Sequence, residues 1–133
     1  MMSLAILFAA ASPQPAPPAE VQREIVVIGK RLATWKATIR SKDGRIQCVT
    51  TASSGDQAID DIGCGAMSTC VPQFGPRIIA SADKRRSPAE RKALAAATNT
   101  EIAACLTAER GKLIGELADR RYEARLGSNN AAD

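Results

Sequence analysis

Histidine is absent from this 133-residue sequence, and aromatic residues are scarce, with one Trp, one Tyr and two Phe. The lack of histidine excludes catalysis or metal binding through an imidazole. Alanine accounts for 25 residues, so few bulky apolar side chains are left to build a core. A chain of this length and composition excludes a multidomain enzyme, a transmembrane helix bundle and a Rossmann-type sheet with its helices.

A short apolar run, Leu4–Ala11, stands near the start of the chain. It is too short to span a bilayer as a helix, and it is typical of the apolar part of a secretory signal. We predict a signal peptide over residues 1–11, with cleavage after Ala11 or Ala19, and a Pro/Ala-rich linker over residues 12–23. These features predict a periplasmic or secreted protein with no transmembrane segment after cleavage.

The sequence contains four cysteines: Cys48, Cys64, Cys70 and Cys105. An even number in a short exported chain predicts two structural disulfides, each contributing roughly 2–4 kcal/mol to stability. The spacings match neither a zinc knuckle nor a redox C-x-x-C motif. We favour the pairing Cys48–Cys64 with Cys70–Cys105, and Cys48–Cys70 with Cys64–Cys105 is a close alternative.

Three segments have the residue patterns of β-strands. Glu24–Ile28 is a β-branched run that ends at a glycine, which predicts a short strand. Trp35–Arg40 and Arg45–Thr50 alternate apolar and polar side chains around an Asp-Gly turn, which predicts a β-hairpin. The face of the hairpin that we expect to point inward carries Trp35, Ala37, Ile39, Ile46 and Cys48.

Two helices are predicted in the middle of the chain. Ser54 and the Gln three residues later form a capping-box pattern, which predicts a helix over residues 56–70. Pro72 should end this helix. Residues 76–82 are predicted to form a second, short helix.

A long helical pattern fills the rest of the sequence. Ser87 with Glu90 repeats the capping-box pattern, and Pro88 occupies the first helical position, where proline is favoured. We expect a break or kink near Thr98, because the residues around it have low helix propensity. Gly127 should end the helix, and residues 128–133 are predicted to be a disordered tail.

Two groups of known proteins share features with this sequence. Glu24–Gly29, Trp35, Cys48 and the Ile-Gly-Cys…Cys pattern within Ser54–Cys70 resemble small exported alphaproteobacterial proteins of the sphingomonad type, of uncharacterised function. This resemblance implies export and paired cysteines, and it implies no activity. Separately, Glu24–Gly29 is similar to the start of the plug in TonB-dependent outer-membrane receptors.

A basic run, Lys84, Arg85 and Arg86, is a candidate anion-binding site. Outside the cytoplasm such a site would meet lipid headgroups or another anionic surface. Aromatic residues do not alternate with the basic ones, which argues against binding of nucleic acid.

An acidic cluster, Asp56, Asp60 and Asp61, lies at the start of the first predicted helix. Acidic residues there are typical of a helix N-terminus, where they favour the helix dipole. A carboxylate pair or a weak cation site is the alternative interpretation. The sequence indicates no catalytic residue, no cofactor and no metal site.

Together these features predict a small α+β fold: a β-hairpin or short sheet on three to four helices, stapled by disulfides, in one domain over residues 24–127. The predicted function is a non-catalytic binding protein of the cell envelope, whose partner is an envelope protein or an anionic surface. One alternative is a secreted hydrolase inhibitor that presents Pro72–Pro76 as a loop. Another is a small enzyme that uses the carboxylates of Asp60 or Asp61.

Overall fold

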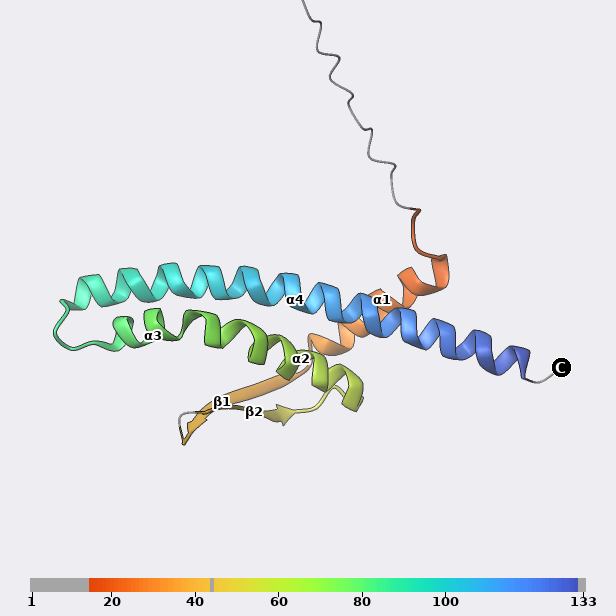
Figure 1. Ribbon diagram of the computed structural model, residues 1–133, viewed down its shortest axis with the longest axis horizontal. Helices are drawn as coiled ribbons and strands as arrows, with labels where there is room; N and C mark the ends of the chain where they lie inside the picture. The colour runs from red at the N-terminus through yellow and green to blue at the C-terminus, as the bar shows by residue number, and fades with distance from the viewer. Residues whose placement is uncertain (1–14, 44, 132–133) are drawn as a thin grey trace, which may run out of the picture.

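A computed structural model describes residues 15–43 and 45–131 of the chain (Figure 1). The predicted signal peptide lies outside these residues. The helices and strands are α1 (Ala19–Leu32), β1 (Lys36–Lys42), β2 (Arg45–Ala52), α2 (Gln57–Cys70), the 3-10 helix η1 (Val71–Phe74), α3 (Gly75–Ala82) and α4 (Pro88–Asn130). A β-hairpin combined with helices confirms the predicted α+β class.

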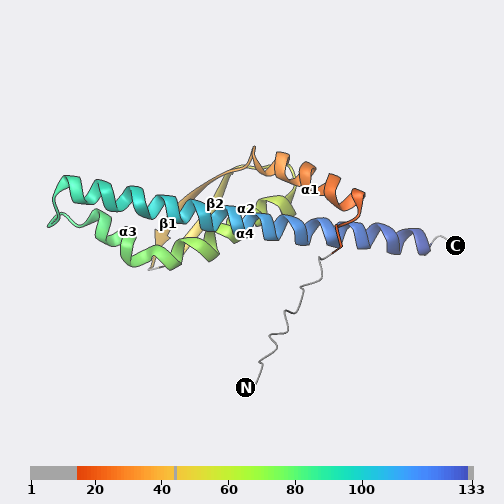
Figure 2. The same ribbon diagram turned by 90° about the horizontal axis from the view of Figure 1, so that it is seen from above.

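The long helix α4 organises the molecule. Its 43 residues extend about 64 Å, because an α-helix rises about 1.5 Å per residue. α2, η1 and α3 run along α4 in the opposite chain direction, and α1 packs against its C-terminal half (Figure 2). The hairpin β1–β2 follows α1 and lies at the edge of the molecule beside α2 (Figure 1).

α1 replaces the strand that the sequence predicts for Glu24–Ile28, so that prediction is wrong. The helix begins at Ala19, which also corrects the predicted linker, and cleavage after Ala19 would remove only its first residue. Apolar side chains recur at intervals of three and four residues through this segment, the spacing of one helical face. Those that pack in or against the core are Val21, Ile25, Ile28 and Leu32.

The two strands form an antiparallel hairpin, as predicted, with Ile39 opposite Cys48. Trp35 is buried, and Ala37 and Cys48 are half-buried and pack against the core, which confirms the predicted inward face for these three residues. Ile39 and Ile46 share that face but are exposed, because they lie further toward the tip. At the turn, Asp43 has a φ of +54°, the left-handed conformation that Asp adopts more readily than most residues.

α2 begins close to its predicted position but with a different cap. Asp56 is the N-cap, and its carboxylate accepts the backbone N–H of Ala58 at 3.0 Å. The predicted capping box at Ser54 is wrong, because the Ser54 hydroxyl donates to the carboxylate of Asp60 instead, at 2.6 Å. The cap therefore lies two residues further along the chain.

Prolines mark helix starts in this chain. Pro72 ends α2 as predicted, but the chain continues at once into η1, where proline near the first position loses no helical hydrogen bond. The predicted helix over residues 76–82 is α3. α4 begins as predicted, with Pro88 at its start and the Ser87 hydroxyl accepting the N–H of Glu90 at 3.2 Å.

α4 is unbroken, so the predicted break near Thr98 is wrong. Thr98 is buried, and its hydroxyl donates to the carbonyl of Leu94 at 2.7 Å, which satisfies this polar group inside the helix. α4 also continues past Gly127 to Asn130, which corrects the predicted start of the tail.

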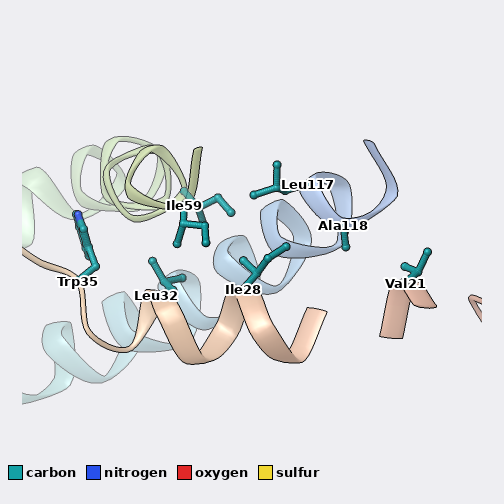
Figure 3. Packing of buried hydrophobic residues seen from close by; sticks show 8 residues of the cluster. Val21, Ile28, Leu32, Trp35, Ile59, Leu117 and Ala118 are labelled. Carbon is teal, nitrogen blue, oxygen red and sulfur yellow. The ribbon is translucent and has the colours of Figure 1, made fainter. Parts of the chain in front are cut away.

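The core is small and lies where α1, α2 and the C-terminal half of α4 meet. Figure 3 shows its side chains converging from these three helices and from the segment before β1. The buried members of the cluster are Val21, Ile28, Leu32, Trp35, Ile59, Ile62, Leu117 and Ala118.

Two disulfides join α2 to its neighbours, in the pairing that the sequence favours. Cys48–Cys64 links β2 to α2, with a Cα–Cα distance of 5.6 Å. Cys70–Cys105 links the end of α2 to α4, with a Cα–Cα distance of 5.9 Å. All four cysteines are therefore bonded, and α2 carries one end of each bridge.

Candidate interaction site

Asp60 is the most buried of the acidic candidates, with 6% of its surface exposed. Its carboxylate accepts hydrogen bonds from the hydroxyls of Ser53 at 2.5 Å and Ser54 at 2.6 Å. These bonds, that of Ser53 first, hold the pKa of Asp60 below its usual value, because they stabilise the ionised form. A general acid needs a raised pKa, so this shift argues against that role. Through its hydrogen bonds with Ser53 and Ser54, Asp60 joins the β2–α2 loop to α2.

Asp56 joins α2 to α4 and, through one guanidinium, to α1. It accepts a hydrogen bond from Arg121 at 2.6 Å, and Arg121 also donates to Glu24 at 3.2 Å. The Arg121 hydrogen bond is the main cause that lowers the pKa of Asp56. Asp61 is exposed and accepts the side-chain amide of Gln57 at 2.8 Å. No group of three His, Cys, Asp or Glu side chains suited to a metal occurs among residues 15–43 and 45–131.

Lys84, Arg85 and Arg86 lie in the loop between α3 and α4. Arg85 donates to both carboxylate oxygens of Asp83, from Nε at 3.1 Å and from a terminal nitrogen at 3.0 Å. This hydrogen bonding lowers the pKa of Asp83 and raises that of Arg85. One of the three basic side chains is therefore paired with its own neighbour, and anion binding at this loop stays a prediction.

The segment Pro72–Pro76 does not form the protruding loop that a hydrolase inhibitor would present. Its residues form η1 and the start of α3. The guanidinium carbon of Arg77 lies 5.8 Å from the centre of the Phe74 ring, and Arg77 also pairs with Glu101 of α4. These contacts hold the segment against α4.

The base and the middle of the β1–β2 hairpin are anchored in three ways. The indole ring of Trp35 lies on the backbone of Gly63, so close that a Cβ there would be 2.6 Å from a ring carbon. The indole N–H donates to the hydroxyl of Thr50 at 3.0 Å. The disulfide Cys48–Cys64 adds a covalent link to α2. The anchored base fixes the direction in which the rest of the hairpin points.

The hairpin has an outer face that points away from α2. Lys42 is directly opposite Arg45, and Arg40 is opposite Gln47, which places the three basic side chains about 5–8 Å apart at Cβ. Like charges directly opposite each other destabilise a β-hairpin. The outer face consists of the exposed residues Thr38, Arg40, Lys42, Arg45, Gln47 and Val49.

The tip of the hairpin extends beyond the helices that cover its base (Figure 1). On its inner face Ile39 and Ile46 are 37% and 41% exposed, and Val49 on the outer face is 39% exposed. The basic outer face is a site that was not predicted from the sequence, although its signal is present there. The same alternation that directs Ile39 and Ile46 inward directs the basic residues outward.

Comparison with known proteins found no relative of the chain. No protein-family model matches it, and no curated protein and no solved structure is significantly similar. The resemblance to small exported alphaproteobacterial proteins stays a prediction. Glu24–Gly29, which resembles the receptor plug, is helical here. Within the described part of the chain, every helix is too short or too polar to cross a membrane.

Proposed function

We propose that this chain is an exported, non-catalytic protein of the cell envelope that binds an anionic component through the outer face of the β1–β2 hairpin. The observation that carries the proposal is the cross-strand pair Lys42 and Arg45, with Arg40 beside it, at the tip of a hairpin whose disulfide anchor, Cys48, lies at mid-strand. The pair repels itself in the free protein. An anionic group bound between Lys42 and Arg45 would attract both side chains and offset their mutual repulsion.

Export is supported by the two disulfides, because such bonds persist in oxidising compartments and are rare in the cytosol. A non-catalytic role is supported by the contacts of the acidic candidates. Asp56 and Asp60 are held ionised by partners within the fold, and histidine is absent from the chain.

Site-specific photo-crosslinking in cells that produce the protein tests this function. A photoreactive residue at Gln47, on the outer face, should capture an envelope component reproducibly. The same residue at Asn99, which is exposed on α4, is the matched control and should capture much less. Mass analysis without reductant on the extracytoplasmic fraction should find both disulfides formed.

The capture should weaken when Arg40 and Arg45 are replaced by Gln in the same chain. Equal capture from Gln47 and Asn99 would contradict binding through the hairpin. Recovery of the protein from the cytoplasm with free thiols would contradict export.

A further inference from the structure

We propose that the partner of the hairpin is the surface of a bilayer that contains anionic phospholipid. This inference rests on the proposed function and specifies its partner. The tip would enter the headgroup layer, so that Lys42 and Arg45 of the outer face meet the headgroups while Ile46 of the inner face approaches the acyl chains.

Positive charge is unevenly distributed along the chain. The segment from Lys36 to Ala52 contains four basic residues and one acidic residue, a net charge of +3, whereas the whole chain has a net charge of +4. In α4 the basic and acidic residues nearly cancel. The segment from Arg77 to Arg86 has the same net charge of +3, but Arg85 there is paired with Asp83 and Arg77 with Glu101. The hairpin is therefore one of two basic elements, and its cations share one projecting face, which favours one orientation above an anionic surface.

Apolar side chains are exposed on the inner face of the hairpin, opposite the cations. Ile46, one pair from the tip, is 41% exposed, and Ile39, at the middle of the same face, is 37% exposed. Free phosphate or a soluble polyanion offers these side chains nothing to contact. A bilayer interface offers anionic headgroups and apolar acyl chains within a few ångströms of each other, and it binds elements that present both kinds of side chain.

The hairpin is held in place in the free protein. Cys48–Cys64, at the middle of the hairpin, and the contact of Trp35 with Gly63, at its base, hold the hairpin to α2 before any partner arrives. Binding therefore orders little more than the basic side chains themselves. The described part of the hairpin contains no aromatic residue, so it lacks the stacking platform that single-stranded nucleic acid requires.

Co-sedimentation with lipid vesicles tests the inference on the oxidised protein. The probes are vesicles of phosphatidylcholine alone and vesicles that also contain phosphatidylglycerol. The protein should bind only the anionic vesicles, and high salt should release it. Each basic side chain near an anionic leaflet strengthens binding about fivefold. The triple variant Arg40→Gln, Lys42→Gln, Arg45→Gln should therefore bind about 100-fold more weakly.

The α3–α4 loop provides the matched control. The triple variant Lys84→Gln, Arg85→Gln, Arg86→Gln removes the same charge from the other basic cluster, and we expect less than about a fivefold loss because its charges are screened from the docked face. The hairpin variant should fold normally, because it removes a repulsive pair; thermal unfolding checks this. Equal losses in the two variants, or equal binding to neutral vesicles, would overturn the inference.

A second variant separates a bilayer from a soluble polyanion. Ile39→Ser with Ile46→Ser should weaken binding to anionic vesicles about tenfold, because it removes the apolar contact. It should leave binding to dextran sulfate unchanged. An unchanged affinity for anionic vesicles would overturn the inference that the partner is a bilayer.

The vesicle experiment tests the bilayer inference, and the crosslinking experiment tests the proposed function, so a failure of one can be told from a failure of the other. If the protein ignores anionic vesicles while Gln47 specifically captures an envelope protein, the bilayer inference is wrong and the proposed function stands. If neither the vesicles nor the crosslinker finds a partner for the hairpin, both are wrong.

Discussion

The two halves of α4 are held in the fold by different means. The C-terminal half lies against α1 and α2 and contributes Leu117 and Ala118 to the core. The N-terminal half lies against α3, and α3 contains no buried residue. The structure describes every residue of this half of α4, and among them only Thr98 is buried. The disulfide Cys70–Cys105 crosses between α2 and α4 at this thinly packed end.

The difference follows from composition. Between residues 93 and 97, four of five positions are alanine, and an alanine buries little apolar area on folding. A core made from such residues cannot offset the entropy lost on ordering the chain. The bridge closes a loop with a sequence separation of 35, which stabilises the fold by about 4 kcal/mol through the unfolded state. Covalent linkage thus replaces apolar packing in this half.

The largest expected effect is the loss of that bridge. Cys70→Ser with Cys105→Ser should destabilise the protein by about 4 kcal/mol. Hydrogen exchange should show α3 and the N-terminal half of α4 unprotected, while α1 and the C-terminal half of α4 keep more of their protection. A uniform loss of protection along α4 would show that the two halves are not distinct.

The next effect compares one leucine from each half. Leu117→Ala should cost roughly 2–4 kcal/mol, because Leu117 is 4% exposed in the core and its removal leaves a cavity. Leu94→Ala, at a half-buried position beside α3, should cost about 1 kcal/mol. Urea unfolding of the oxidised proteins measures both. Equal costs would contradict the picture of one cored and one thinly packed half.

A smaller effect tests the contact that orients the hairpin within the cored half. Gly63→Ala should cost roughly 1–3 kcal/mol by overpacking, because its Cβ would lie 2.6 Å from the ring of Trp35. Gly65→Ala is the control two residues away. Its Cβ would lie 3.6 Å from a methyl group of Leu113, so this change should stabilise α2 by up to about 1 kcal/mol. If both variants were more stable than the natural chain, the packing of Trp35 would not require a glycine at position 63.

The smallest effect is a dependence on acid. Because the fold lowers the pKa of Asp60, the ionised carboxylate contributes stability that is fully present above the ordinary Asp pKa of about 3.9. This contribution is lost as the pH falls through the lower folded value. Unfolding at neutral pH and near pH 3 should therefore differ less in Asp60→Asn than in the natural chain, and Ser53→Ala should have an intermediate effect. An undiminished difference in Asp60→Asn would rule out this carboxylate as a source of acid sensitivity.

The sequence was sufficient for the hairpin and the start of α4, because these depend on local alternation and capping residues. It favoured the observed disulfide pairing but left a second pairing open, because the choice depends on how the helices pack. It misled at α1. The β-branched run Glu24–Ile28 has the composition of a strand. The helical spacing appears only when the window is widened to include Val21 and Leu32, which pack on α2 and α4.

The continuous course of α4 also could not be predicted locally. Thr98 and Thr100 are poor helix formers, but each hydroxyl donates to a carbonyl four residues earlier in the same helix. Packing against α3 and the bridge at Cys105 then hold the segment in place. Tertiary contacts of this kind outweigh weak intrinsic propensity.

The candidate site shows a further limit of reading charge along the chain. Lys84–Arg86 is the densest basic run in the sequence, but Arg85 is engaged by Asp83. On the hairpin the basic residues are separated in the sequence and come together only through strand pairing, with Lys42 opposite Arg45. The basic cluster on the hairpin can therefore be found only when the pairing register of the two strands is known.

The position of both bridges on α2 has a mechanical consequence. A pull on the hairpin passes through Cys48–Cys64, along fewer than two turns of α2, and through Cys70–Cys105 into α4. The chain segments between residues 48 and 64 and between residues 70 and 105 bear no tension, because the two disulfides connect their ends directly. A hairpin tethered to a large partner would thus transmit tension to the longest helix of the molecule without unravelling the polypeptide between them.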